Sequence, residues 1–180
     1  ATSWGVSTRL IGALIMVHGD DKGLRLPPNI APIQVVIIPV INKDYSEVEF
    51  NNYTKKLISN LESKGIRYHI DNREQYSVGY KFNEWEMKGV PLRVEIGPRD
   101  IKNNQIVMAR RDNNEKGNIL INDSFNKIED YLDQIQNNLF DQAKQFMEDN
   151  TFTVSNYNEF KKQIKDGGFI KCGWDGLPDT

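Results

Sequence analysis

Charged residues in the middle of the chain form a pattern that could bind a polyanion. Between Lys88 and Asp112 there are six basic residues and three acidic ones, a local charge of +3. Between Asp123 and Asp149 there are two basic residues and seven acidic ones, a local charge of −5. One region could therefore face a polyanion while the other faces away from it.

In and just before the basic region, cations and carboxylates recur at spacings that bring them together. The first three share a helical face, the next two share a strand face, and the last two lie in the loop that follows: Lys81, Glu84, Lys88, Arg93, Glu95, Arg99 and Asp100. Phe82 and Tyr80 are the nearest aromatic side chains on which an unstacked base could lie. Alternating charges are equally typical of a salt-bridged surface, and Arg110 and Arg111 could either contact backbone phosphate or simply flank a hairpin.

Arg9 is the residue with most chemistry near the amino end. A guanidinium can hold phosphate oxygens through paired hydrogen bonds and stabilise charge that develops on them. On its spacing alone, however, Arg9 is more typical of an arginine at the start of a helix that forms a surface salt bridge.

Cysteine and histidine are too few for a metal site or a disulfide framework. The single cysteine, Cys172, cannot form an internal disulfide, and the two histidines are scattered. Asp175, three residues after Cys172, offers a carboxylate where a cysteine-based metal site would need a second thiolate. We therefore expect no metal ligands, a structural Cys172, and a reducing, cytoplasmic setting.

The overall composition fits one globular domain with smaller pieces at either end. The chain has 180 residues, of which 38% are hydrophobic and 27% are charged. Its net charge of −2 argues against a protein that coats nucleic acid without specificity. It contains no apolar stretch of the length, about 18 residues, that a membrane span needs.

The elements that must position these residues alternate between strands and helices. A β-branched run at 34–40 predicts a strand buried on both faces, and Ser46 with Glu49 has the spacing that begins a helix. The other elements are expected as helices at 8–18, 79–88, 125–147 and 156–165, and as strands at 66–70, 92–96, 105–110 and 118–121, the last two around a loop at 112–117. Trp85 and Met87 are assigned to the core. The order β-α-β-α-β-β-β-α predicts an α/β sandwich with a mixed sheet of about five strands.

The two ends of the sequence lack the features of a complete chain. The chain begins at Ala1 without an initiator methionine or a signal-peptide pattern, and it ends in turn-rich residues at 173–180. We expect it to be part of something longer.

Several short blocks, in a fixed order, resemble a known family. The segments TSWGVSTR at 2–9 and HGDDKGL at 18–24 resemble the third signature motif of prolyl-tRNA synthetases of the eukaryotic and archaeal type. The resemblance continues through Pro27 and Pro28, QVVIIP at 34–39, GYKFNEWEMKGVP at 79–91 and GPRD at 97–100. It covers most of the chain, and so many blocks in order are not matched by chance.

The resemblance implies three segments and a catalytic role for the first. It implies the end of a class II catalytic domain at 1–30, a three-layer α/β anticodon-binding domain at 31–150, and the start of a C-terminal domain at 151–180. Arg9 would be the catalytic arginine that holds the ATP triphosphate, Gly5 and Ser7 would lie beside the nucleotide, and Trp4 and His18 would belong to the substrate pocket. The parent enzyme would use ATP with Mg²⁺, proline and proline tRNA, and would be a homodimer through segments absent here. Because the first two signature motifs are absent, we expect this chain alone to be inactive and to bind no cofactor.

For the middle segment the resemblance implies recognition of an anticodon. Proline anticodons carry guanine at their second and third positions, and guanine offers O6 and N7 as acceptors and N1 and N2 as donors. Reading it takes both a cation and a carboxylate. The expected anticodon-binding residues are therefore Phe82 and the seven charged residues named above: Lys81, Glu84, Lys88, Arg93, Glu95, Arg99 and Asp100.

Three other interpretations stay open. The chain could be a stand-alone RNA-binding module of the same fold, although the block at 2–9 with its ATP arginine counts against that. It could be the equivalent domain of a threonyl, histidyl or glycyl synthetase, which we would not expect to carry the blocks at 18–24 and 79–91 together. A purely structural dimerisation domain is disfavoured by the local charge of +3.

Overall fold

The structure is a computed structural model that describes residues 1–41, 43, 45–174 and 176. It divides into two compact units, Ala1–Leu139 and Phe140–Thr180. The first unit contains a five-stranded sheet, and the second contains a small two-stranded sheet.

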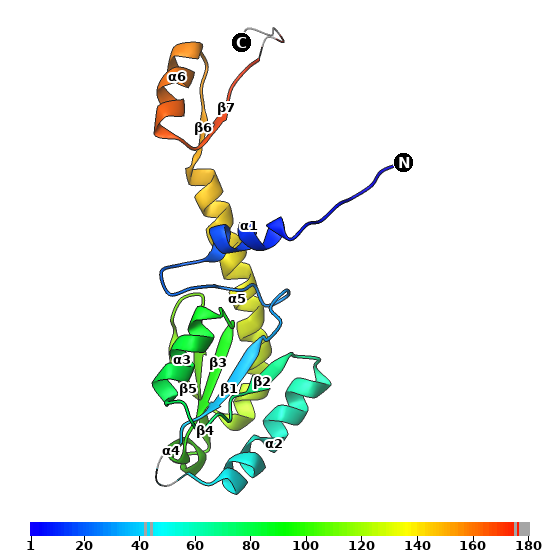
Figure 1. Cartoon of the computed structure of the whole chain (residues 1–180), viewed down its shortest axis with the longest axis vertical. Coiled ribbons are helices and arrows are strands. Elements are labelled where there is room, and N and C mark those ends of the chain that lie inside the picture. The colour runs from blue at the N-terminus through cyan, green and yellow to red at the C-terminus, as the bar shows by residue number, and fades with distance from the viewer. Residues whose placement is uncertain (42, 44, 175, 177–180) are drawn as a thin grey trace. The chain divides into compact units, whose positions relative to one another are not determined.

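The large sheet is mixed, as the sequence predicts. Its strands are β1 (Val35–Pro39), β2 (Tyr68–Ile70), β3 (Leu92–Ile96), β4 (Gln105–Arg110) and β5 (Lys116–Leu120), in the order β2-β1-β3-β4-β5 (Figure 1). β1 runs parallel to β2 and β3, whereas β3, β4 and β5 are antiparallel. All five residues of β1 are buried, which confirms the strand expected from its β-branched run.

One face of this sheet carries the main core under two helices, α2 (Glu47–Ser63) and α5 (Ile121–Asp149). Ser46 begins α2 as predicted, because its Oγ accepts a hydrogen bond from the Glu49 backbone N at 3.4 Å. The apolar side of each helix repeats every three to four residues and is buried against the strands: Phe50, Leu57 and Leu61 from α2, and Ile128, Leu132, Ile135 and Leu139 from α5.

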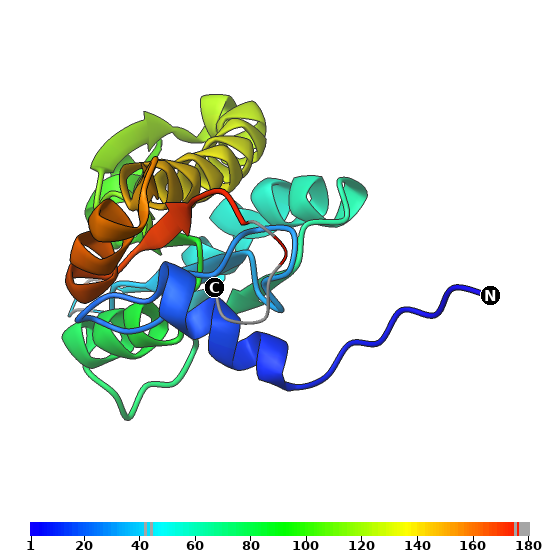
Figure 2. The ribbon, with the colours of Figure 1, turned by 90° about the horizontal axis from the view of Figure 1, so that it is seen from above.

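The opposite face is covered only in part, by α3 (Val78–Met87). Trp85 and Val90 pack there against Val36 and Ile38 of β1, with Phe82 beside them. Figure 2 shows α3 on one side of the sheet and α2 and α5 on the other. This arrangement confirms the three-layer α/β fold.

The first helix, α1 (Arg9–His18), has no buried residue, although its sequence is largely apolar. Five large apolar side chains along it are exposed: Leu10, Ile11, Ile15, Met16 and Val17. The linker that follows is tied to the end of α3, because the Leu24 N donates to the Met87 carbonyl at 3.0 Å and the Leu26 N donates to the Gly89 carbonyl at 3.1 Å. The linker is therefore part of the first unit even though α1 exposes its apolar side chains.

Three details differ from the sequence prediction. A short helix, α4 (Pro98–Lys102), follows β3 where a loop was expected, because the Asp100 side chain accepts from the Gly97 N at 2.9 Å and holds the turn. The hairpin is tighter, since β5 already begins at Lys116, and Ile121 begins α5 instead of ending a strand. Met87, assigned to the core, is 58% exposed.

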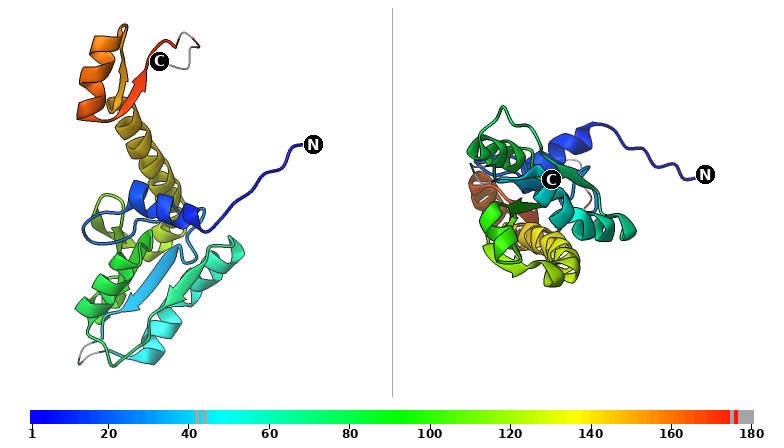
Figure 3. Two further views of the ribbon diagram at one scale, coloured as in Figure 1. Left: turned by 45° about the horizontal axis from the view of Figure 1, so that its top comes forward. Right: turned by 90° about the horizontal axis from the view of Figure 1, so that it is seen from below.

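In the second unit, a parallel pair of strands flanks one helix. These are β6 (Thr151–Thr153), α6 (Tyr157–Asp166) and β7 (Phe169–Lys171), as Figure 3 shows. The helix was predicted, and the Asn156 side chain caps it by accepting from the Glu159 N at 3.0 Å. The two strands were not predicted, because three residues are too few for a periodic pattern. Throughout the part of the chain that the structure describes, no helix is long and apolar enough to cross a membrane.

Candidate functional site

The face of the sheet that α3 covers in part carries two rows of side chains. Strand register places Val36, Arg93, Ala109 and Lys116 opposite one another in the first row. The second row contains Ile38, Glu95, Val107 and Asn118. Because directly opposed residues point to the same face, the polar members of both rows share one surface. We call the part of it beyond α3, formed by Arg93, Glu95, Val107, Lys116 and Asn118, the open sheet face.

Arg93 and Glu95 are joined on the open sheet face as the sequence predicts. Arg93 Nε lies 3.0 Å from Glu95 Oε1, and Lys116 Nζ lies 2.8 Å from Glu95 Oε2. The Arg93 guanidinium also lies 4.2 Å from the centre of the Phe82 ring, within the range of a cation–π contact. Glu95 is only 7% exposed and Arg93 19%, so both have fixed positions, whereas Lys116 is 49% exposed.

A cavity of about 210 Å³ opens between α3 and the first row. Ala109 creates the space, because its methyl group stands between the longer side chains of Arg93 and Lys116. Its wall includes five basic residues, each paired with a carboxylate: Lys22, Arg93, Arg110, Arg111 and Lys116. A concave, partly apolar space with convergent polar groups is the usual form of a binding site.

Four residues of this cavity were missed as binding residues by the sequence analysis: Lys22, Glu86, Asn114 and Lys116. Lys22 Nζ lies 3.1 Å from the Glu86 carboxylate and donates to Asn114 Oδ1 at 3.2 Å. Lys22 and Glu86 lie within the blocks at 18–24 and 79–91, so the resemblance could have indicated them. Lys116 was hidden because the loop was expected to run to residue 117.

The predicted anticodon residues on α3 do not all reach this cavity. Successive residues of a helix are about 100° apart, so Phe82 and Glu86 lie on one flank of α3 and Glu84 and Lys88 on the other. The contacts agree: Phe82 meets Arg93, whereas Glu84 lies 2.5 Å from Arg73 and 2.7 Å from Lys88. The hydrogen bonds from Arg73 and then Lys88 lower the pKa of Glu84.

Lys81 faces the interior instead of a ligand. Its side chain is 1% exposed, and Nζ donates to the Asp71 carbonyl at 3.0 Å. Asp71 is fully buried and accepts from Arg73 at 2.9 and 2.8 Å and from Trp85 Nε1 at 2.8 Å. Burial raises the pKa of Asp71, but the hydrogen bonds outweigh it and the net pKa lies below the ordinary value. Lys81 and Trp85 therefore hold α3 against the sheet.

The phosphate-binding alternative for Arg110 and Arg111 does not fit their positions. Both are buried, at 8% and 6% exposure. Arg110 forms a bidentate pair with Asp112 at 3.0 and 2.8 Å, and Arg111 forms one with Asp20 at 2.7 and 2.5 Å. Each guanidinium is thus already paired with a carboxylate. The alternative in which Arg110 and Arg111 simply flank the hairpin therefore fits the structure better.

Arg99 and Asp100 lie on α4, at the end of β3. Asp100 Oδ2 caps the helix through the Gly97 N, and its Oδ1 accepts from Gln105 at 3.3 Å. Arg99 is exposed. Of this pair, only Arg99 presents its side chain to solvent for a ligand.

The residues expected around ATP are open to solvent. Gly5, Ser7 and Arg9 are all exposed, and Trp4 is 92% exposed. His18 is half-buried; burial and the nearby Arg25 lower its pKa, and its carbonyl accepts from Arg25 Nε at 2.7 Å. These residues do not enclose a nucleotide here.

The structure offers no metal site within the described residues, where no group of three or more histidine, cysteine or acidic side chains comes together. Cys172 is a free thiol and exposed. Asp175 lies outside the described residues.

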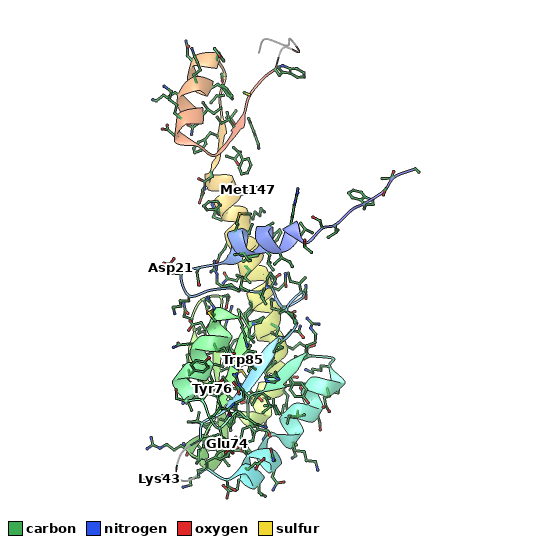
Figure 4. The ribbon with its side chains drawn as sticks, viewed as in Figure 1. Asp21, Lys43, Glu74, Tyr76, Trp85 and Met147 are labelled. Atoms are coloured by element: carbon green, nitrogen blue, oxygen red, sulfur yellow. The ribbon has the colours of Figure 1, made fainter. Side chains whose placement is uncertain are left out.

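Figure 4 labels Trp85, which belongs to α3, and Tyr76, which precedes that helix. The part of the chain that carries the open sheet face is similar to a known protein family. The anticodon binding domain family matches residues 34–131, which include the whole large sheet.

Two curated relatives match almost the entire chain. A protein named proline–tRNA ligase 2 from Clostridioides difficile (strain 630) is 49% identical over 97% of the chain and 36% of its own length. A proline–tRNA ligase from Chlorobium phaeobacteroides (strain BS1) is 51% identical over 100% of the chain and 37% of its own length. The chain thus spans little more than a third of the length of these relatives.

A solved structure is similar over the same extent. The prolyl-tRNA synthetase from Cryptosporidium parvum, crystallised with L-proline and AMP, superposes with a TM-score of 0.89 at 38% identity. The match covers 96% of this chain and 37% of that one.

Proposed function

The chain belongs to the anticodon binding domain family, and from this premise we propose that it recognises the anticodon of proline tRNA as part of a longer proline–tRNA ligase. The relatives named above support the proposal, because they match the chain from end to end and carry that name. A stand-alone RNA-binding module or a threonyl, histidyl or glycyl synthetase domain has no comparable support.

The observation that carries the proposal is the joined pair of Arg93 and Glu95 beside a cavity that five basic residues help to line. A guanidinium can donate to guanine O6 and N7, and a carboxylate can accept from N1 and N2, so the pair presents both chemistries that a guanine requires. Phe82 lies against Arg93 and offers a ring on which a base can stack.

The carboxylate on the open sheet face is held in position before any RNA binds. Glu95 is held from two sides, by Arg93 and by Lys116, so its position is set in the free chain. Lys116 is the more exposed partner and the easier one to displace. A base edge that replaces Lys116 would therefore meet a carboxylate already in place, with little ordering cost.

The proposed binding surface comprises Phe82, Arg93, Glu95 and Arg99, which the sequence predicts, and the cavity adds Lys22, Glu86, Asn114 and Lys116. Asp100, Glu84 and Lys88 belong to it less directly, because their side chains are engaged in the α4 cap or on the other flank of α3. Lys81 supports the surface from within.

The same proposal covers the remaining segments. Residues 1–30 would be the end of a catalytic domain, 31–150 the anticodon-binding domain and 151–180 the start of a C-terminal domain. The longer ligase would use ATP with Mg²⁺ and proline, act as a homodimer and work in the cytoplasm. Arg9, with Gly5 and Ser7, would contact ATP, and Trp4 and His18 the substrate pocket, only when the rest of the catalytic domain surrounds them.

The test is binding of the chain to an anticodon stem-loop of proline tRNA. Replacing both anticodon guanines with adenines should weaken binding at least about fivefold, since a wrong base costs about 1–3 kcal/mol. Replacing guanine with inosine removes only the N2 donor, so it tests one of the two hydrogen bonds that the carboxylate would accept. Equal affinity for all three stem-loops would contradict the proposal.

A second measurement tests whether the chain alone can activate proline. The chain alone should give no proline-dependent exchange of pyrophosphate into ATP, because Arg9 and its neighbours are open to solvent. Measurable exchange would show that residues 1–30 do not depend on further segments.

A further inference from the structure

Two tyrosines and an arginine form an exposed column on the β2 flank of α3. The Tyr76 and Tyr80 rings are stacked with centres 4.6 Å apart and planes 15° apart. The Arg73 guanidinium lies 4.9 Å from the centre of the Tyr76 ring. We call Arg73, Tyr76 and Tyr80 the tyrosine stack; it lies on the opposite flank of α3 from Phe82 and Glu86.

The base of this column is rigid. The Arg73 guanidinium donates to both oxygens of Asp71, at 2.9 and 2.8 Å, and Asp71 is fully buried. A third hydrogen bond joins Arg73 to Glu84 at 2.5 Å. Tyr76 thus rests on a cation whose own position is fixed from the core.

The top of the column is open. Tyr76 is 39% exposed and Tyr80 is 49% exposed. No contact within the described residues extends the stack beyond Tyr80. A flat ring left half in water at the end of a pre-ordered stack can accept one more flat ring at low entropic cost.

The charged groups around the stack are paired with one another, and the cations are the more exposed partners of these pairs. The two cations are its more exposed groups, with Arg73 at 33% and Lys88 at 48%, whereas Glu84 between them is 15% exposed. Planar rings beside arginine and lysine are the combination that binds unstacked bases of single-stranded RNA.

We propose that the tyrosine stack binds one unpaired base of the tRNA anticodon loop outside the two guanines, by stacking on Tyr80. The inference rests on the proposed function and adds a second contact to it. α3 would then hold the loop from both flanks, through the guanine-reading residues on one and the tyrosine stack on the other. Stacking is indifferent to base identity, so the contact adds affinity and orientation but no sequence preference.

The test combines a protein variant with an RNA variant. Tyr80→Ala should weaken binding of the proline anticodon stem-loop at least about fivefold, the effect expected for loss of one base–aromatic stack. Tyr80→Phe should retain full affinity. Tyr157→Ala is the matched control, because Tyr157 is also exposed and stacked, on Phe160, but lies in the second unit.

Stem-loops with one abasic nucleotide, placed in turn at each loop position outside the guanines, identify the base. One of them should bind wild type more weakly yet lose nothing further with Tyr80→Ala. The salt dependence should stay unchanged in Tyr80→Ala, since no phosphate contact is lost.

Failure of this inference can be told from failure of the proposed function. If wild type prefers guanines and Tyr80→Ala binds as wild type does, the tyrosine stack does not touch the loop and only the inference is overturned. If wild type shows no guanine preference, the proposed function itself fails. If Tyr80→Ala instead dissolves a dimer seen by sedimentation, without affecting stem-loop affinity, the stack is a self-association contact and the inference is again overturned.

Discussion

The guanidinium of Arg111 and the carboxylate of Asp20 form a bidentate ion pair between residues that lie 91 positions apart in the chain. Arg111 follows β4, and Asp20 lies in the linker after α1. The Arg111 Nε also donates to the Glu86 carbonyl on α3 at 3.0 Å. One buried side chain therefore joins the linker, the helix beside the cavity and the end of a strand.

Replacing Arg111 with alanine should lower the free energy of unfolding by about 2–3 kcal/mol, because it removes the bidentate ion pair with Asp20 and the hydrogen bond to the Glu86 carbonyl. Urea denaturation measures this. Arg99→Ala is the control, since the same change at an exposed arginine should stay within about 0.5 kcal/mol. Equal effects of the two changes would mean that the Arg111 ion pair adds nothing to stability.

The Asp20 carboxylate should make part of this stability depend on pH. The hydrogen bond from Arg111 is the main reason why the pKa of Asp20 falls from 3.8 to about 2. A carboxyl group with a depressed pKa contributes stability that is fully present above its unfolded value and is lost as the pH falls through its folded value. The stability difference between wild type and Asp20→Asn should therefore shrink from about pH 5 toward pH 2. Other carboxylates titrate in both proteins, so a difference that stays constant with pH would contradict this assignment.

Gly89 should tolerate no side chain. Its φ is +74°, and a Cβ there would lie 2.5 Å from Leu24 Cβ and 2.7 Å from the Leu24 carbonyl carbon. Gly89→Ala should cost about 2 kcal/mol or more, from the left-handed backbone and from the collision. Hydrogen exchange at the Leu26 N–H, which donates to the Gly89 carbonyl, should accelerate.

The control is Gly79→Ala. Nothing lies within 4 Å of a Cβ at that position, and alanine is favoured over glycine in a helix by up to about 1 kcal/mol. A Gly89→Ala variant as stable as wild type would show that the linker does not depend on this close approach.

Much of the fold follows from short-range patterns. The β-branched run of β1 and the Ser46 cap of α2 are local signals, and both elements form where those signals predict them. Elements too short to show a periodic pattern were missed. α4 depends on Asp100 reaching back to a backbone N–H, and β6 and β7 are each three residues long and pair across 18 positions of sequence, as Thr151 opposite Phe169 shows.

The site was less predictable, because charge spacing does not reveal burial. Lys81, Glu84 and Lys88 share a face in the sequence pattern, yet Lys81 turns into the core because Asp71, ten residues earlier, offers its carbonyl there. Arg111 finds its partner 91 positions away, which no periodicity could indicate. Arg93 and Glu95 were predicted to share a face and do so, because strand alternation fixes side-chain direction directly.

Arg93 and Glu95 should carry the discrimination between bases, because both already point to the open sheet face and lie 3.0 Å apart. Arg93→Ala should reduce the preference for the proline stem-loop, over one with its guanines replaced, by an amount equivalent to about 1–3 kcal/mol. Glu95→Gln should reduce this preference less, since an amide oxygen accepts from N1 and N2 more weakly than a carboxylate does.

The control is Lys102→Ala, which removes the same charge from an exposed position on α4 and should weaken binding of both stem-loops equally, if at all. Fluorescence titration at two salt concentrations separates the effects, because base contacts change the ratio of affinities whereas phosphate contacts change their salt dependence. If Arg93→Ala behaves as Lys102→Ala does, Arg93 holds the backbone of the loop and the bases are read by other residues of the cavity.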